Sequence, residues 1–174
     1  TDFRTMHARL TTSMNGNEIL GMDIAVDDQG RARIDSGDAL SIIVDPNRQE
    51  MLQLFHDAGM AARVPLTQDA QEETAGLEWL TEIRDYQGQA RLIDEARVID
   101  GDEVFGFRLT QQAIDMTLWA TESGRPVLLE MATGNEVAPT VTRIRFDFDR
   151  PVDPERFSLD VPAGYTAEAR AEDG

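Results

Sequence analysis

Alternation of apolar and polar residues is the feature that most constrains what this chain can fold into. From Thr5 to Met14, residues suited to a core and residues suited to water largely take turns along the sequence. Because successive side chains of a β-strand point to opposite faces of a sheet, this pattern predicts a half-buried strand. Asn15-Gly16 follows, and both residues tolerate the positive φ that a two-residue hairpin turn requires. The sequence therefore predicts an antiparallel hairpin here.

The same alternation returns along most of the chain, with strands spaced about 8–10 residues apart. Near the end, Pro151–Phe157 predicts one helical turn that leads into a last short strand at Ser158–Val161. Together these segments predict an antiparallel meander. The other predicted strands are Leu20–Val26, Arg31–Ser36, Leu40–Asp45, Met51–His56, Met60–Leu66, Leu92–Ile99, Glu103–Thr110, Ile114–Thr121, Val127–Thr133 and Thr140–Asp149.

One segment, Asp69–Gln87, breaks the alternation. It opens with acidic residues at capping-box spacing, and Leu77, Leu80 and Ile83 form an apolar stripe at helical spacing. Gly88 stands where a C-terminal cap belongs. An amphipathic helix must bury its stripe, and the sheet is the surface available. The expected fold is mainly β: a single strongly curved antiparallel sheet, or open half-barrel, of about ten or eleven strands with this inserted helix covering it.

The charge balance excludes several classes of function. The chain has 33 acidic and 16 basic residues, a formal net charge of −17, and every basic residue is arginine. Such a surface repels phosphate backbones, which argues against nucleic-acid binding. There is no cysteine, so disulfides, thiolate metal sites and a cysteine nucleophile are absent. No apolar run approaches the length of a membrane-spanning helix.

No catalytic motif stands out in the sequence. The nucleophile elbow, the zinc-protease motif, the P-loop and the dinucleotide-binding glycine pattern are all missing. His7 and Ser13 share a strand face but lie roughly 20 Å apart along it, too far for a nucleophile and its base. We therefore expect a protein that is not an enzyme and that has no cofactor.

Three acidic loops offer oxygen ligands for calcium, although none has the spacing of an EF-hand. Asp and Gly are also the ordinary residues of tight turns, and turn formation is the preferred interpretation. We expect no metal site. The loops are Asp27-Asp28, Asp100–Glu103 and Asp147–Asp153.

One of the two tryptophans and three strand arginines have two interpretations each. Trp119 is predicted on the strand face opposite Met116 and Leu118, either as an exposed contact for a partner or, the preferred interpretation, as a ring covering the sheet. Trp79 belongs to the helical stripe and is expected to pack. Three strand arginines are expected to pair with carboxylates across strands, although one at a cavity mouth would suit a lipid headgroup or a terminal carboxylate. They are Arg108, Arg143 and Arg145.

The order of elements, together with two local motifs, resembles the bacterial outer-membrane lipoprotein carrier (LolA/LolB-like) superfamily. The first motif is the strand–turn–strand that runs from Trp119 through Gly124-Arg125-Pro126. The second is the closing segment Phe157-Ser158-Leu159, which continues through Pro162 to Tyr165. The resemblance implies a single domain over residues 1–167, and residues 168–174 are expected to fray as an acidic tail. It also implies a half-barrel that holds lipid tails on its concave face.

Eleven apolar residues are the candidate ligand lining of that face. They form either a packed core under the helix or a site left open for a ligand, since the two differ only in how completely the space is filled. Methionine suits an irregular apolar ligand because its side chain is flexible and polarizable. The candidates are Leu10, Leu20, Met22, Ile24, Ile42, Val44, Leu80, Met116, Leu118, Leu129 and Met131.

Two functions remain open on these grounds. One is a non-catalytic binding protein for a lipid or a lipoprotein acyl chain. The other is a protein-interaction or sensor ectodomain of an envelope-stress or anti-sigma-type regulator, with an envelope protein as its partner and no lipid carriage. The sequence opens at Thr1 without an initiator methionine. With the resemblance, this leads us to expect an extracytoplasmic protein of the periplasm or cell envelope whose targeting or anchoring segment has been removed.

Overall fold

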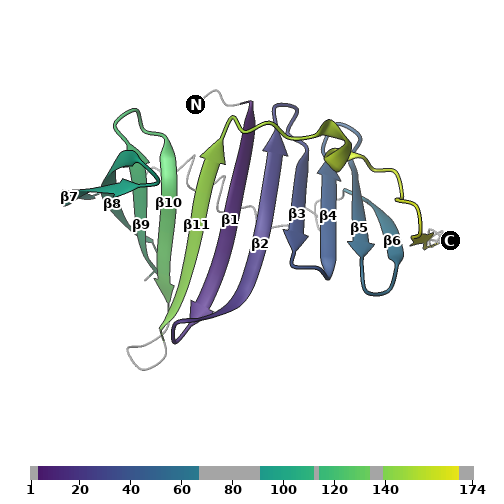
Figure 1. Cartoon of the computed structure of the whole chain (residues 1–174), viewed down its shortest axis with the longest axis horizontal. Coiled ribbons are helices and arrows are strands. Elements are labelled where there is room, and N and C mark those ends of the chain that lie inside the picture. The colour runs from purple at the N-terminus through teal and green to yellow at the C-terminus, as the bar shows by residue number, and fades with distance from the viewer. Residues whose placement is uncertain (1–3, 67–90, 112–113, 134–138, 169–174) are drawn as a thin grey trace.

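The computed structural model describes residues 4–66, 91–111, 114–133 and 139–168. They form one large, curved, unclosed antiparallel sheet, an open half-barrel (Figure 1). This confirms the predicted fold class. The predicted helix at Asp69–Gln87, with Leu80 and Trp79, lies outside the described residues. Within the described part of the chain, no helix is long and apolar enough to cross a bilayer.

The sheet consists of two meanders that meet at its centre (Figure 1). The strand order is β12-β6-β5-β4-β3-β2-β1-β11-β10-β9-β8-β7. Strands β1 to β11 match the predicted strands in order, and their ends differ by a few residues at most. Their bounds are β1 Thr5–Met14, β2 Asn17–Asp27, β3 Ala32–Ser36, β4 Leu40–Asp45, β5 Glu50–Phe55, β6 Met60–Pro65, β7 Arg91–Ile99, β8 Asp102–Gln111, β9 Ile114–Thr121, β10 Pro126–Thr133 and β11 Thr140–Phe148.

The pairing of β1 with β11 joins the two meanders. The register runs from Met6 opposite Phe148 to Met14 opposite Thr140, so two strands far apart in the sequence form the centre of the sheet. The strand after β1 in the sequence, β2, and the strand before β11, β10, lie on their outer sides. This arrangement leaves β7 at one edge of the sheet and β6, with the short β12, at the other.

Positive-φ residues make the tight turns that the sequence predicts. Asn15 has φ 53° and Gly16 has φ 81°, and Asp100 and Gly101 repeat the pattern at 54° and 93°. Turns of this kind match the right-handed twist of the strands they join. The Asn15-Gly16 hairpin is therefore confirmed.

The end of the chain differs from the prediction. The expected helical turn is present as η2, Pro154–Phe157, but the expected strand at Ser158–Val161 is wrong. Leu159 is buried against the face of the sheet, and its carbonyl accepts a hydrogen bond from Arg63 at 2.7 Å, so the segment crosses the face instead of joining the ladder. A twelfth strand, β12 (Thr166–Ala167), pairs in parallel with β6 (Figure 1).

The register gives the sheet two chemically different faces. Residues directly opposite each other project from the same face, so the pairings can be followed from strand to strand. All seven methionines project from one face, which we call the methionine face. The opposite, arginine face carries all eight arginines of the described strands. These are Arg9, Arg33, Arg63, Arg91, Arg97, Arg108, Arg143 and Arg145.

Each face has its own apolar clusters. The largest lies on the methionine face of the central strands, and Leu129 and Ile144 at its middle are fully buried. On the arginine face, the stretch after η2 covers β4 to β6 with Leu159, and a smaller cluster surrounds Trp119. The buried members of the largest cluster are Met6, Ala8, Leu10, Ile24, Ile34, Leu129, Ile144 and Phe146.

The substitution Leu129→Ala tests the central cluster. We expect it to lower the free energy of unfolding by about 2–5 kcal/mol, because it leaves a cavity in a fully buried position. The control is Leu92→Ala, the same substitution at a side chain that is 54% exposed, for which we expect a change of at most about 0.5 kcal/mol. Urea unfolding measures both, and equal losses in the two variants would contradict this account of the core.

Candidate functional site

Ten of the eleven predicted lining residues lie together on the methionine face, and the eleventh, Leu80, lies outside the described residues. Leu10 stands opposite Met22, and Leu129 stands opposite Leu118. Strand alternation places them there, and the β1–β11 pairing brings the two halves of the set side by side. The ten come from five strands: Leu10, Leu20, Met22, Ile24, Ile42, Val44, Met116, Leu118, Leu129 and Met131.

The burial of this set changes from the centre outward. Leu10, Ile24 and Leu129 are buried, whereas Leu20 near the β1–β2 turn is 41% exposed. The remaining six are half-buried. The set therefore has a buried centre and half-buried surroundings. These six are Met22, Ile42, Val44, Met116, Leu118 and Met131.

Methionine supplies much of the adaptable part of this surface. Met22, Met116 and Met131 are half-buried and pack against the central cluster, and Met116 stands directly opposite Met131. Their unbranched thioether side chains can fill irregular spaces by changing rotamer. The face therefore combines buried aliphatic residues at its centre with adaptable methionine side chains around them.

Trp119 is buried on the arginine face, so the predicted covering role is confirmed and the exposed-contact interpretation is wrong. Its indole Nε1 donates a hydrogen bond to Glu130 at 3.1 Å. Arg97 lies over the ring, with the guanidinium carbon 4.4 Å from the ring centroid. The ring thus joins three strands through packing, a hydrogen bond and a cation–π contact.

The predicted cross-strand pairing is confirmed for Arg143, whereas Arg145 pairs with a carboxylate in the β7–β8 turn. Arg143 Nε donates to Glu130 at 2.9 Å, and Arg145 Nη2 lies 2.9 Å from a carboxylate oxygen of Asp100. Arg108 behaves differently, because its register partners are Thr117 and another arginine, Arg91.

The acidic loops use their carboxylates to shape turns. Asp27 Oδ1 accepts hydrogen bonds from the backbone N–H groups of Gln29 and Arg31, at 3.0 and 2.9 Å. Asp153 accepts from the N–H of Glu155 and so begins η2. Among the residues that the structure describes, no three His, Asp or Glu side chains are placed to bind a metal.

A polar cluster that the sequence analysis missed lies under the C-terminal stretch. Ser41 is 2% exposed, and its hydroxyl lies 2.8 Å from His56 Nε2 and within hydrogen-bonding distance of Asp35. Arg33 Nη2 donates to the same hydroxyl at 3.0 Å. The other ring nitrogen of His56 contacts the hydroxyl of Tyr165. The β4–β5 hairpin register was a signal for Ser41 and His56, but nothing local pointed to Tyr165.

The assignment of hydrogen-bond donors and acceptors defines the role of this cluster. The Ser41 hydroxyl has one proton, which goes to the Asp35 carboxylate, so His56 Nε2 must donate to Ser41 rather than accept from it. In the neutral imidazole, His56 Nδ1 then accepts from the Tyr165 hydroxyl. A histidine in this state cannot remove the serine proton, and the serine is closed to solvent. The cluster therefore fastens Tyr165 to the sheet.

We expect Tyr165→Phe to lower the free energy of unfolding by about 0.5–1.5 kcal/mol, the usual net value of one hydrogen bond. A double-mutant cycle with His56→Gln, followed by urea unfolding, isolates the contact. The loss from Tyr165→Phe should shrink when His56 is already replaced. Additive losses would show that the two side chains do not interact.

His7 is the second titratable group of note on the arginine face. Its Nε2 is buried and has no hydrogen-bond partner among the described residues. Burial, together with the nearby positive charges of Arg150 and Arg156, lowers the pKa of His7, while Asp147 opposes the shift. The unfolded chain therefore binds a proton at this position more readily than the folded chain does.

This difference predicts a pH dependence of stability. As pH falls below 6.5, the ordinary pKa of histidine, the unfolded state takes up the His7 proton first and the folded state loses stability. We expect His7→Gln to lose less stability than the unmodified protein between about pH 7.5 and about pH 5.5. Urea midpoints at the two pH values measure this, and parallel losses in both proteins would contradict it.

Comparison with solved structures finds remote similarity. No family model matches the sequence, and no curated protein matches it. PNGF-II, solved in two space groups, is 9% identical in each, with TM-scores of 0.42 and 0.40 over 95% and 94% of this chain. This chain spans only 31% and 30% of the PNGF-II chains. A LolA superfamily protein from Nitrosomonas europaea is 10% identical, with a TM-score of 0.38 over 90% of each chain.

Proposed function

We propose that this chain is a non-catalytic binding protein that holds an apolar ligand, such as a lipid or a lipoprotein acyl chain, on its methionine face. One observation carries the proposal: all seven methionines project from the face that also collects the ten described lining residues. Ordinary core packing requires apolar residues but does not require that every methionine lie on one side. An adaptable apolar surface does favour methionine.

The charge distribution supports the same proposal. Described strand arginines are confined to the opposite face, so no arginine of the described strands interrupts the apolar surface. An acyl chain gains about 0.8 kcal/mol per buried CH₂ from such a surface, whereas a charged group there would cost free energy. An extracytoplasmic location, where such ligands are handled at the cell envelope, is part of this proposal.

A second candidate function is an interaction or sensor domain that binds an envelope protein instead of a lipid. The observation that favours it lies around the turn between β1 and β2. Met14, Ile19 and Leu20 there are 42%, 57% and 41% exposed. Neighbouring exposed apolar side chains are common at protein contacts. Met14 and Leu20 belong to the methionine face as well, at the end of the central strands nearest the turn.

Displacement of a fluorescent fatty acid tests the proposal directly. We expect the unmodified chain to bind the probe and unlabelled fatty acids to displace it. The double variant Met116→Gln/Met131→Gln should bind at least about tenfold more weakly, which corresponds to about 1.4 kcal/mol of lost apolar contact. The side-chain length is nearly kept, so the change tests polarity more than volume.

The matched control is Thr117→Gln, which lies on the same strand between Met116 and Leu118 but projects from the arginine face. It should bind the probe as the unmodified chain does, and circular dichroism checks that every variant is folded. Native mass spectrometry after mild extraction gives an independent readout of bound lipid. No probe binding and no bound lipid, or equal weakening by the control, would favour the interaction domain.

A further inference from the structure

Two arginines face each other across the outermost pair of strands of the second meander, β7 and β8. Arg91 on β7 and Arg108 on β8 are direct register partners, so their side chains project from the same face at neighbouring positions. Like charges directly opposite each other destabilise a sheet. Both side chains are exposed, so the repulsion is moderated by water. The arrangement is still unexpected in a chain with 33 acidic residues.

Three other arginines on this face each have a partner, unlike Arg91 and Arg108 in the described part of the chain. Arg143 pairs with Glu130 and Arg145 with Asp100, and Arg97 lies over the ring of Trp119. Among the residues that the structure describes, no carboxylate pairs with Arg91 or Arg108. Glu130 accepts hydrogen bonds from both Trp119 and Arg143, so both of its oxygens are engaged elsewhere.

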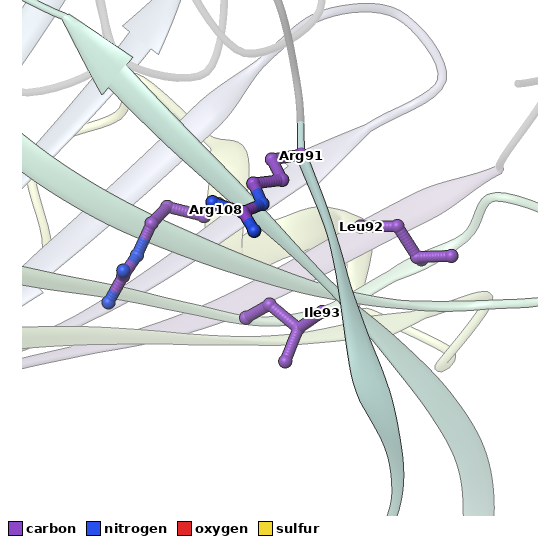
Figure 2. A pocket seen from close by; sticks show the side chains of 4 residues that line it. All are labelled: Arg91, Leu92, Ile93 and Arg108. Atoms are coloured by element: carbon purple, nitrogen blue, oxygen red, sulfur yellow. The ribbon is translucent and has the colours of Figure 1, made fainter.

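A cavity lies beside this pair. It has a volume of about 310 Å³, and its described lining residues are Arg91, Leu92, Ile93 and Arg108. Figure 2 shows Arg91, Ile93 and Arg108 on one side of β7 and Leu92 on the other. The volume reaches the lower end of the range of small-molecule sites, about 300–1,000 Å³. Positive charge, an apolar wall and space thus meet at one place.

The apolar wall of the cavity, Ile93, lies close to Gly106 of β8. A Cβ at Gly106 would lie 2.9 Å from Cζ3 of Trp119 and 3.0 Å from Cδ1 of Ile93. A glycine at this position leaves space beside its backbone for both the Ile93 side chain and the indole. The backbone between Leu92 and Ala96 carries a register irregularity, which sets the start of β7 apart from the regular ladder.

We propose that Arg91 and Arg108 bind a phosphomonoester group, with Ile93 packing against the organic part of the ligand. Two guanidinium groups match the charge of a phosphomonoester, about −1.5 to −2 at pH 7, and their planar forks suit its oxygens. A bound phosphate would also relieve the repulsion between the two arginines. This site lies on the arginine face and is independent of the apolar site proposed above.

The overall charge of −17 makes the proposal easy to test. An acidic protein repels anions in general, so non-specific phosphate binding is weak and a local site gives a clear signal. Isothermal titration calorimetry with inorganic phosphate, at constant ionic strength set by chloride, measures binding to the full chain. We expect saturable binding with one phosphate per chain, at a pH of about 7.5 where the dianion dominates.

Three variants connect that binding to the two arginines. Arg91→Gln and Arg108→Gln should each weaken phosphate binding at least about tenfold, the loss expected when one charge-assisted contact is removed. Arg108→Lys keeps the charge without the fork, so its affinity should fall between that of Arg108→Gln and the unmodified chain. The matched control is Arg145→Gln, which removes an exposed arginine from the same face and should leave binding unchanged.

Titrations with two further ligands distinguish a soluble phosphate compound from a lipid headgroup. Glycerol 3-phosphate represents a soluble compound, and phosphatidylcholine vesicles with phosphatidic acid, compared with phosphatidylcholine alone, represent a lipid headgroup. Binding of either source that depends on Arg108 supports the site and identifies its ligand class. The proposal is overturned if the unmodified chain responds to none of these probes, or if Arg145→Gln weakens binding as much as Arg108→Gln does.

Discussion

The backbone register of a single sheet is the constraint on which the rest of this structure depends. Because side chains alternate with a period of two, a slip of one residue in any strand would move its methionines to the arginine face. The β1–β11 ladder is the most consequential pairing, since it aligns two halves of the chain that are otherwise independent meanders. Its register from Met6 to Met14 makes one continuous apolar face out of two separate ones.

Most of the sheet could be predicted from the sequence because its information is local. Leu40–Asp45 and Ile114–Thr121 were predicted with the bounds that the structure has. Alternation and turn residues act within a few positions, so strands and turns can be predicted from them without knowledge of the fold. Ser158–Val161 has the same alternation for another reason: Leu159 and Val161 pack onto a sheet face, while Asp160 between them is exposed. Local pattern cannot separate these two causes.

The candidate sites also differ in whether local pattern or long-range contacts determine them. The methionine face was predictable because each of its residues alternates within its own strand, whatever that strand's neighbour. The Ser41–His56–Tyr165 cluster was not, since Tyr165 arrives from 109 residues away in the chain. The meeting of Arg91 and Arg108 was also hidden, because the register irregularity in β7 decides which residues oppose each other. Long-range contacts and register are properties of the folded chain.

An unclosed sheet keeps two edges, and the two edges of this one are protected differently. At one edge, β12 covers part of β6 with a two-residue parallel pair, which His56 and Tyr165 help to hold in place. At the other, β7 carries charged residues and a register irregularity, features that discourage another strand from adding on. The C-terminal stretch thus covers an edge strand in addition to packing on the face of the sheet. Trimming the chain before Thr166 would bare hydrogen-bonding groups on β6 and open a route to edge-to-edge aggregation.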